Sequence, residues 1–190
     1  TRDSAGNLLL VRNQNINVSN FVREGVDVEA RYLLDLDSAG SIDFSAVATR
    51  MFTAETVIAP GTLTGGATID ENGEIGQPEW RFRGNALYGN GPLLVNATVT
   101  MLSDQVPDNQ PANPEDNRAS TGTGTFTLVD LSAQYEWSDQ INFSLGADNI
   151  FDEQPPGLPD TRAGGGGSFA GAEIYPIVGR YYYLSTRVRF

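Results

Sequence analysis

The stretch that decides the fold is VGRYYYLSTRVRF, which runs from Val178 to Phe190. Its residues alternate between two sets, and successive side chains of a β-strand point to opposite faces. One set is Val178, Arg180, Tyr182, Leu184, Thr186, Val188 and Phe190, and the other is Gly179, Tyr181, Tyr183, Ser185, Arg187 and Arg189. The pattern predicts a strand with an apolar and a polar face, and a strand of an outer-membrane β-barrel has this form, with lipid on one side and the lumen on the other.

The same alternation recurs along the chain. The further expected strands cover residues 25–36, 41–52, 79–89, 93–102, 126–137 and 140–150, with a weaker one at 7–21. About eight strands are therefore expected. No run approaches the roughly 18 apolar residues of a membrane-spanning helix.

The connections between these strands alternate between short and long. Short turns are expected at residues 37–40, at Asn90-Gly91 and at Ser138-Asp139, and long loops at 53–78, 103–124 and 151–173. Outer-membrane barrels have short turns at the periplasmic rim and long loops outside. The sequence predicts an all-β chain that forms part of an antiparallel, up-and-down transmembrane β-barrel. A soluble sheet with one face in water is the alternative.

The composition excludes several kinds of site. The chain has 24 acidic and 12 basic residues, a net charge of -12, and no Cys or His. Disulfides, Cys/His zinc sites, Cys nucleophiles and Ser-His-Asp triads are therefore excluded. Nucleic acid is not an expected partner, because its phosphates require a basic surface. No cofactor and no enzyme activity are predicted.

Two motifs resemble the C-terminal part of the barrel of TonB-dependent outer-membrane receptors. Residues 146–155, GADNIFDEQP, resemble the segment that ends the penultimate strand of those receptors, and residues 175–190 resemble their last strand. Pro78-Glu79-Trp80-Arg81 and the GVDVE run at residues 25–29 resemble two further strand starts. The resemblance extends over essentially the whole chain and is most specific from Pro78 onward.

The resemblance implies a barrel of about 22 strands with a plugged lumen. Residues 1–190 would be its C-terminal portion, with the plug domain and the TonB box outside this chain, which starts at Thr1 without Met. We expect the C-terminus in the periplasm and the long loops outside the cell. The implied partners are outer-membrane lipid, the rest of the barrel, the plug, the TonB complex, the barrel-assembly machinery and a small-molecule nutrient.

Three groups of residues receive roles. The resemblance implies that the last strand is the signal read by the barrel-assembly machinery, and the apolar positions of that signal are Tyr182, Leu184, Val188 and Phe190. The expected lumen-facing residues are Arg81, Arg83, Asp130, Asp148, Arg187 and Arg189. The candidate ligand residues of the loops are Asp104, Asp108, Asn109, Glu115, Asp116, Asp152 and Asp160.

The expected substrate belongs to the oligosaccharide, siderophore or vitamin class. The acidic, amide-rich loops suit sugar hydroxyls or a cationic ligand and would repel an anionic ferric siderophore, so they favour a neutral polar ligand such as an oligosaccharide. The expected function is TonB-energised uptake of a scarce nutrient. A non-transporting barrel that acts as an adhesin or assembly scaffold is the alternative.

Overall fold

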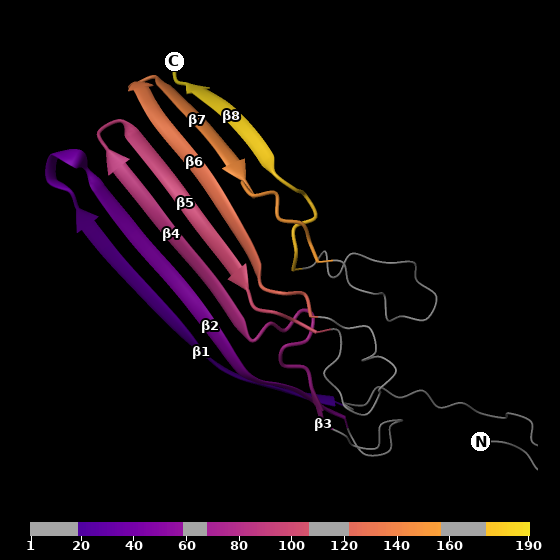
Figure 1. Cartoon of the computed structure of the whole chain (residues 1–190). Helices are drawn as coiled ribbons and strands as arrows, with labels where there is room; N and C mark the ends of the chain where they lie inside the picture. The colour runs from indigo at the N-terminus through magenta and orange to yellow at the C-terminus, as the bar shows by residue number, and fades with distance from the viewer. Residues whose placement is uncertain (1–18, 59–67, 107–121, 157–173) are drawn as a thin grey trace, which may run out of the picture.

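The computed structural model describes residues 19–58, 68–106, 122–156 and 174–190, which form one antiparallel sheet (Figure 1). The strands are β1 Ser19–Asp35, β2 Ser41–Ile58, β3 Thr68–Asp70, β4 Trp80–Asn90, β5 Leu93–Leu102, β6 Phe126–Ser138, β7 Ile141–Asp148 and β8 Tyr181–Val188. A 3-10 turn, η1 Asp37–Ala39, joins β1 to β2. None of the helical structure in the described residues is long and apolar enough to cross a membrane.

The strands follow one another across the sheet in the order β1-β2-β4-β5-β6-β7-β8, and the short β3 pairs with β2 beside this path. All these neighbours are antiparallel. The prediction of an all-β, up-and-down barrel segment of eight strands is confirmed. Short turns join the strands at one end of the sheet, here called the turn end, and the long connections leave from the opposite end, here called the loop end (Figure 1).

The sequence placed two strand boundaries wrongly. Ser19–Asp35 is one continuous strand, so Phe21 belongs to the same strand as the expected segment 25–36; residues 7–18 of the weaker segment lie outside the described residues. β2 continues to Ile58 and β3 follows, although 53–78 was expected to be a loop. The missed continuation of β2 has a physical cause. The pairing of β1 with β2 shifts at Glu24/Gly25, where a β-bulge leaves Phe52 without a partner and interrupts the period of two.

The register brings the apolar set of every long strand to one face of the sheet. One row of cross-strand partners runs Tyr32, Phe44, Ala86, Ala97, Leu131, Ala147 and Tyr182. Directly opposed residues in a sheet share a face. The apolar face therefore continues from β1 to β8, which a one-residue slip in any pair would have destroyed.

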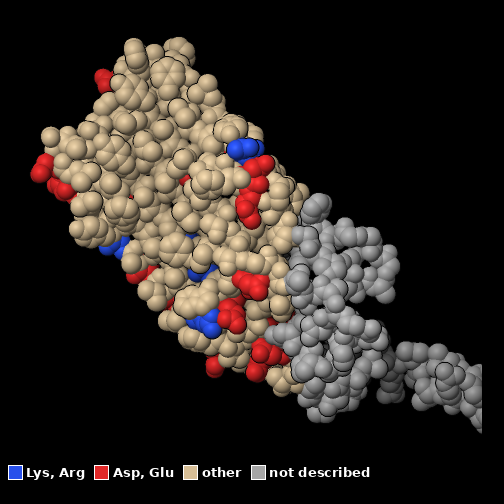
Figure 2. Space-filling model, in the orientation of Figure 1, with Lys and Arg blue, Asp and Glu red and all other residues tan. Residues whose placement is uncertain are grey.

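No element among the described residues covers the apolar face. Among the described residues, the buried hydrophobic side chains are only Ala54, Phe126 and Tyr175, and many large apolar ones are exposed, such as Leu184 at 77% and Tyr32 at 63%. Figure 2 shows few charged side chains over the middle of the strands in this view, with most of the acidic and basic ones toward the ends and one edge of the sheet. An apolar surface of this extent marks a contact with lipid or with another protein.

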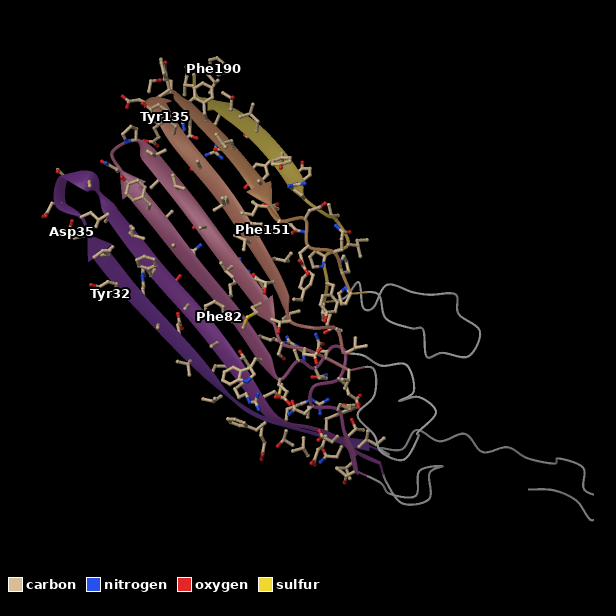
Figure 3. All side chains as sticks on the ribbon, in the orientation of Figure 1. Tyr32, Asp35, Phe82, Tyr135, Phe151 and Phe190 are labelled. Carbon is tan, nitrogen blue, oxygen red and sulfur yellow. The ribbon has the colours of Figure 1, made fainter. Side chains whose placement is uncertain are left out.

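Aromatic residues flank this apolar band at both ends. Tyr32, Phe44, Tyr135, Trp137 and Phe143 lie toward the turn end, and Phe52, Trp80, Phe151 and Tyr182 lie toward the loop end. Figure 3 shows Tyr135 and Phe190 near the turn end and Phe151 at the loop end. Two aromatic girdles around an apolar band are typical of transmembrane barrels. The arrangement favours lipid as the medium that covers this face.

Candidate functional site

The opposite face of the sheet is polar, and it carries the residues predicted to face the lumen. Arg81 pairs across the strands with Thr49, Arg83 with Val47, Asp130 with Thr98, Asp148 with Tyr181, and Arg187 with Asn142. Arg189 continues the same alternation after β8. All six therefore share one face, the one away from the apolar band. Whether that face lines a lumen remains a prediction.

Hydrogen bonds between side chains cross the strands on this polar face. Arg31 forms an ion pair with Asp43 of the neighbouring strand. The Thr49 hydroxyl donates to the Asp27 carboxylate at 2.6 Å, and the Asn85 amide donates to Asn96 at 2.6 Å. The polar side chains of the face are thus partly satisfied within the sheet.

A polar hollow of about 510 Å³ lies on the same face at the turn end of β6, β7 and β8. Its lining includes two carboxylates, Glu136 and Asp139, and two guanidinium groups, Arg187 and Arg189. Within the described part of the chain, no carboxylate forms an ion pair with Arg187 or Arg189. The hollow therefore presents carboxylates and guanidinium groups in equal number, which suits a polar segment that carries complementary charges.

At the loop end, the described residues at the bases of three long connections meet in a buried cluster. Gln105 follows β5 and is fully buried, and Tyr175 precedes β8 and is 1% exposed. The Gln105 amide donates a hydrogen bond to the Tyr175 hydroxyl and accepts one from the Gly76 backbone N–H at 2.9 Å. Burial is the main cause that raises the pKa of the Tyr175 phenol; a hydrogen bond with Thr123 offsets part of the increase, and the Asp104 carboxylate adds to it.

Hydrogen bonds of the GADNIFDEQP motif connect the loop ends of β6, β7 and β8. The Asn149 backbone N–H donates to Asp130 at 2.8 Å, and the Asn149 amide exchanges two 2.8 Å hydrogen bonds with the Glu153 backbone. Asn149 and Asp152 have positive φ values of 51° and 59°, a conformation that Asn and Asp tolerate better than most residues. The local chemistry of the motif therefore explains its tight turn.

Two candidate ligand residues of the loops lie in the described part of the chain. The Asp104 carboxylate accepts from the Gly124 N–H at 2.6 Å, and the Asp152 carboxylate accepts from the Arg180 N–H at 2.8 Å. Both carboxylates thus stabilise the bases of connections. The other five candidates, Asp108, Asn109, Glu115, Asp116 and Asp160, lie outside the described residues.

The residues predicted to form the assembly signal share the apolar face of the last strand. Tyr182, Leu184 and Val188 are partners of Ala147, Leu145 and Ile141 on β7. Phe190 follows β8 and is fully exposed. Their role as a signal remains a prediction.

The sequence did not single out Gln105 as a functional residue. It lies in a polar stretch where nothing distinguishes it from its neighbours, because its burial results from contacts with residues far away along the chain. Tyr175 lies at the start of a quoted motif, but no periodicity indicated that its side chain is buried. The described residues include no group of three acidic side chains that could hold a metal ion.

A family model described as "TonB dependent receptor-like, beta-barrel" matches residues 1–150 of the chain. A search of curated proteins gave no match. The ferric enterobactin receptor PfeA of Pseudomonas aeruginosa, solved in a mutant form, is similar in structure with a TM-score of 0.56 at 22% sequence identity.

The similarity to that receptor covers 90% of this chain and 22% of the receptor chain, so the present chain spans about a fifth of its length. At 22% sequence identity, the structural similarity is evidence for a shared fold. The family match, in contrast, extends over more than half of the chain. The chain therefore belongs to the TonB-dependent receptor family and forms part of the β-barrel of such a receptor.

Proposed function

We propose that this chain is the C-terminal portion of the barrel of an outer-membrane receptor that takes up a scarce small-molecule nutrient with energy from the TonB complex. The main support is the antiparallel sheet of a chain that belongs to this family. One face of the sheet is apolar and flanked by aromatic girdles, and the opposite face is polar. In the proposal, lipid covers the first face and the second lines the lumen.

The strand directions support a larger barrel. Seven strands follow one another through antiparallel pairings from β1 to β8, so β1 and β8 run in the same direction. Their free edges cannot close the sheet by the antiparallel pairing found in up-and-down barrels. An odd number of further strands between them gives an even total, as in bacterial outer-membrane barrels. We assign those strands to the rest of the receptor.

The orientation that we propose for the sheet in the membrane rests on its connections, which are short at one end and long at the other. We place the turn end in the periplasm and the loop end outside the cell, because barrels of this kind keep short turns on the periplasmic rim. The polar hollow beside Arg187 and Arg189 then opens into the lumen near the periplasm. A polar segment of the plug domain is the partner that we propose for it, since the acidic and basic lining residues would hold a segment of complementary charges in register.

Ligand recognition is assigned to the three long connections at the loop end. The strands are committed to lipid on one face and to the lumen on the other, whereas connections held by a rigid scaffold commonly carry binding residues. The chain carries a net charge of -12. An acidic entrance repels anions, so we propose a neutral polar nutrient such as an oligosaccharide.

Uptake by whole cells tests the proposal. We would delete the gene of the complete receptor, restore it from a plasmid, and measure accumulation of labelled oligosaccharides with and without TonB. The proposed function predicts uptake that depends on both proteins. A receptor without its TonB box is the matched control and should bind the ligand at the surface without accumulating it. Equal uptake without TonB would contradict the proposal, and strict dependence on a ferric siderophore would contradict the ligand class.

A further inference from the structure

We infer that Gln105 and Tyr175 join the bases of the three long connections into a single mechanical unit, so that a change at one base is transmitted to the other two. The inference concerns positioning residues at the loop end. Only its last consequence, a change in ligand affinity, rests on the proposed function.

The Gln105 side chain uses both ends of its amide, and each end reaches a different connection. The carbonyl oxygen accepts a hydrogen bond from the Gly76 N–H, which belongs to the connection before β4. The amide nitrogen donates to the hydroxyl of Tyr175, which belongs to the connection before β8. The amide has an acceptor at one end and a donor at the other, so this one side chain binds both groups.

The Gln105 backbone links the two ends of its own connection. Its N–H donates to the Thr123 hydroxyl at 3.0 Å, and its carbonyl accepts from the Thr123 N–H at 2.8 Å. The Asp104 carboxylate adds the 2.6 Å hydrogen bond from the Gly124 N–H. The residues that leave β5 and those that enter β6 are therefore fixed to each other.

A short parallel bridge joins the same connection to the one before β4. Val106 donates to the Gly73 carbonyl at 2.9 Å and accepts from the Ile75 N–H at 3.1 Å. This bridge is independent of the Gln105 side chain. It holds residues 73–76 against the start of the β5–β6 connection, so the Gly76 N–H lies within reach of the amide.

The Tyr175 ring packs against the sheet and so connects the cluster to the strands. Its ring meets the ring of Phe126 edge to face, with centroids 4.9 Å apart and planes at 82°. Phe126 begins β6, is 4% exposed and is the partner of Leu102 on β5. Edge-to-face aromatic pairs in buried positions are favourable and restrict the orientation of both rings. The third connection is thereby tied to the same strands as the second.

Because the cluster is buried, the loss of one of these hydrogen bonds is costly. Gln105 and Tyr175 are nearly inaccessible to solvent, so a lost partner is not replaced readily by water. Replacement of Gln105 by Leu leaves the Gly76 N–H and the Tyr175 hydroxyl without the amide that both bind. The loss therefore falls on two other connections as well as on the one that contains the substitution.

The test is hydrogen–deuterium exchange of the complete receptor in detergent, read on peptides that cover residues 73–76, 104–106, 122–124 and 174–176. In Gln105→Leu we expect exchange to rise in all four segments together by at least about tenfold, because the substitution removes two buried hydrogen bonds. In Tyr175→Phe, which keeps the ring, we expect a smaller rise with the same distribution. The strands toward the turn end should keep their protection in both variants.

Gln140→Leu is the matched control, because Gln140 is exposed in the turn between β6 and β7. It should leave all four segments unchanged. A rise confined to residues 104–106 in Gln105→Leu, with no change at 73–76 or 174–176, would overturn the inference. Tyr175→Phe removes a single oxygen atom, so it provides the same decision if Gln105→Leu fails to assemble.

Ligand binding then separates this inference from the proposed function. If exchange rises in all segments and oligosaccharide affinity falls, both stand. If exchange rises and affinity is unchanged, the three bases are coupled, and the assignment of recognition to the connections is wrong.

Discussion

The backbone N–H of Arg180 donates a 2.8 Å hydrogen bond to the carboxylate of Asp152, which lies 28 residues earlier in the chain. The bond joins the residues that follow β7 to those that precede β8. A Cβ atom on Gly179 would lie 2.6 Å from the same carboxylate oxygen, so the absence of a side chain there permits the approach. The two motifs that suggested the family thus contact each other directly.

We expect Asp152→Ala to weaken the attachment of β8 to β7. The Arg180 N–H would lose its acceptor, and the loss of a hydrogen bond to a charged group costs about 1.5–3 kcal/mol. Exposure of the site should reduce this toward the lower end. The measurement is the fraction of folded receptor on gels of heated and unheated samples. Asp152→Asn keeps an acceptor oxygen and should restore most of the loss; an equally large loss would show that the charge matters more than the hydrogen bond.

The face assignment predicts opposite outcomes for two neighbouring residues of β8. Leu184 is on the apolar face opposite Leu145, whereas Ser185 is on the polar face opposite Ser144. Leu184→Arg places a charge in lipid, which costs about 2–4 kcal/mol near the midplane. Ser185→Arg adds the same side chain to a face that already carries Arg187. Folded receptor in the outer membrane should fall strongly in the first variant and little in the second. Equal losses would contradict the assignment of the faces.

The sequence predicts most of the fold because alternation and turn chemistry are local signals. Asn90-Gly91 marks a two-residue hairpin, and the apolar sets of β4 and β5 lie in register across it. The bulge beside Gly25 was not predictable in this way, because an extra residue on one strand depends on the partner strand. The same reason hides the Gln105–Tyr175 contact, which joins residues that are 70 positions apart.

The buried phenol of Tyr175 gives a pH-dependent prediction. Its pKa is raised in the folded state, mainly by burial, so the folded state favours the protonated phenol. The stabilisation is complete below the unfolded pKa of about 10 and is lost as the pH rises from there through the folded value. The difference in tyrosinate absorbance between the receptor and its Tyr175→Phe variant should therefore show one group that ionises above the exposed tyrosines. A difference signal that titrates with the exposed tyrosines would place the Tyr175 hydroxyl in solvent.

The free edges of β1 and β8 predict how residues 1–190 behave when they are produced alone. Within the described residues, neither edge has a further strand paired to its outer side, and their common direction prevents them from closing on each other in the antiparallel manner. The exposed apolar face adds a second cause of association. We expect the chain to aggregate in buffer and to disperse only in detergent, with a β-sheet circular dichroism spectrum. Sedimentation with and without detergent is the measurement, and the complete receptor, whose remaining strands close the barrel in our proposal, is the control. A monodisperse monomer in detergent-free buffer would mean that the chain covers its apolar face by itself, which would contradict the assignment of that face to lipid.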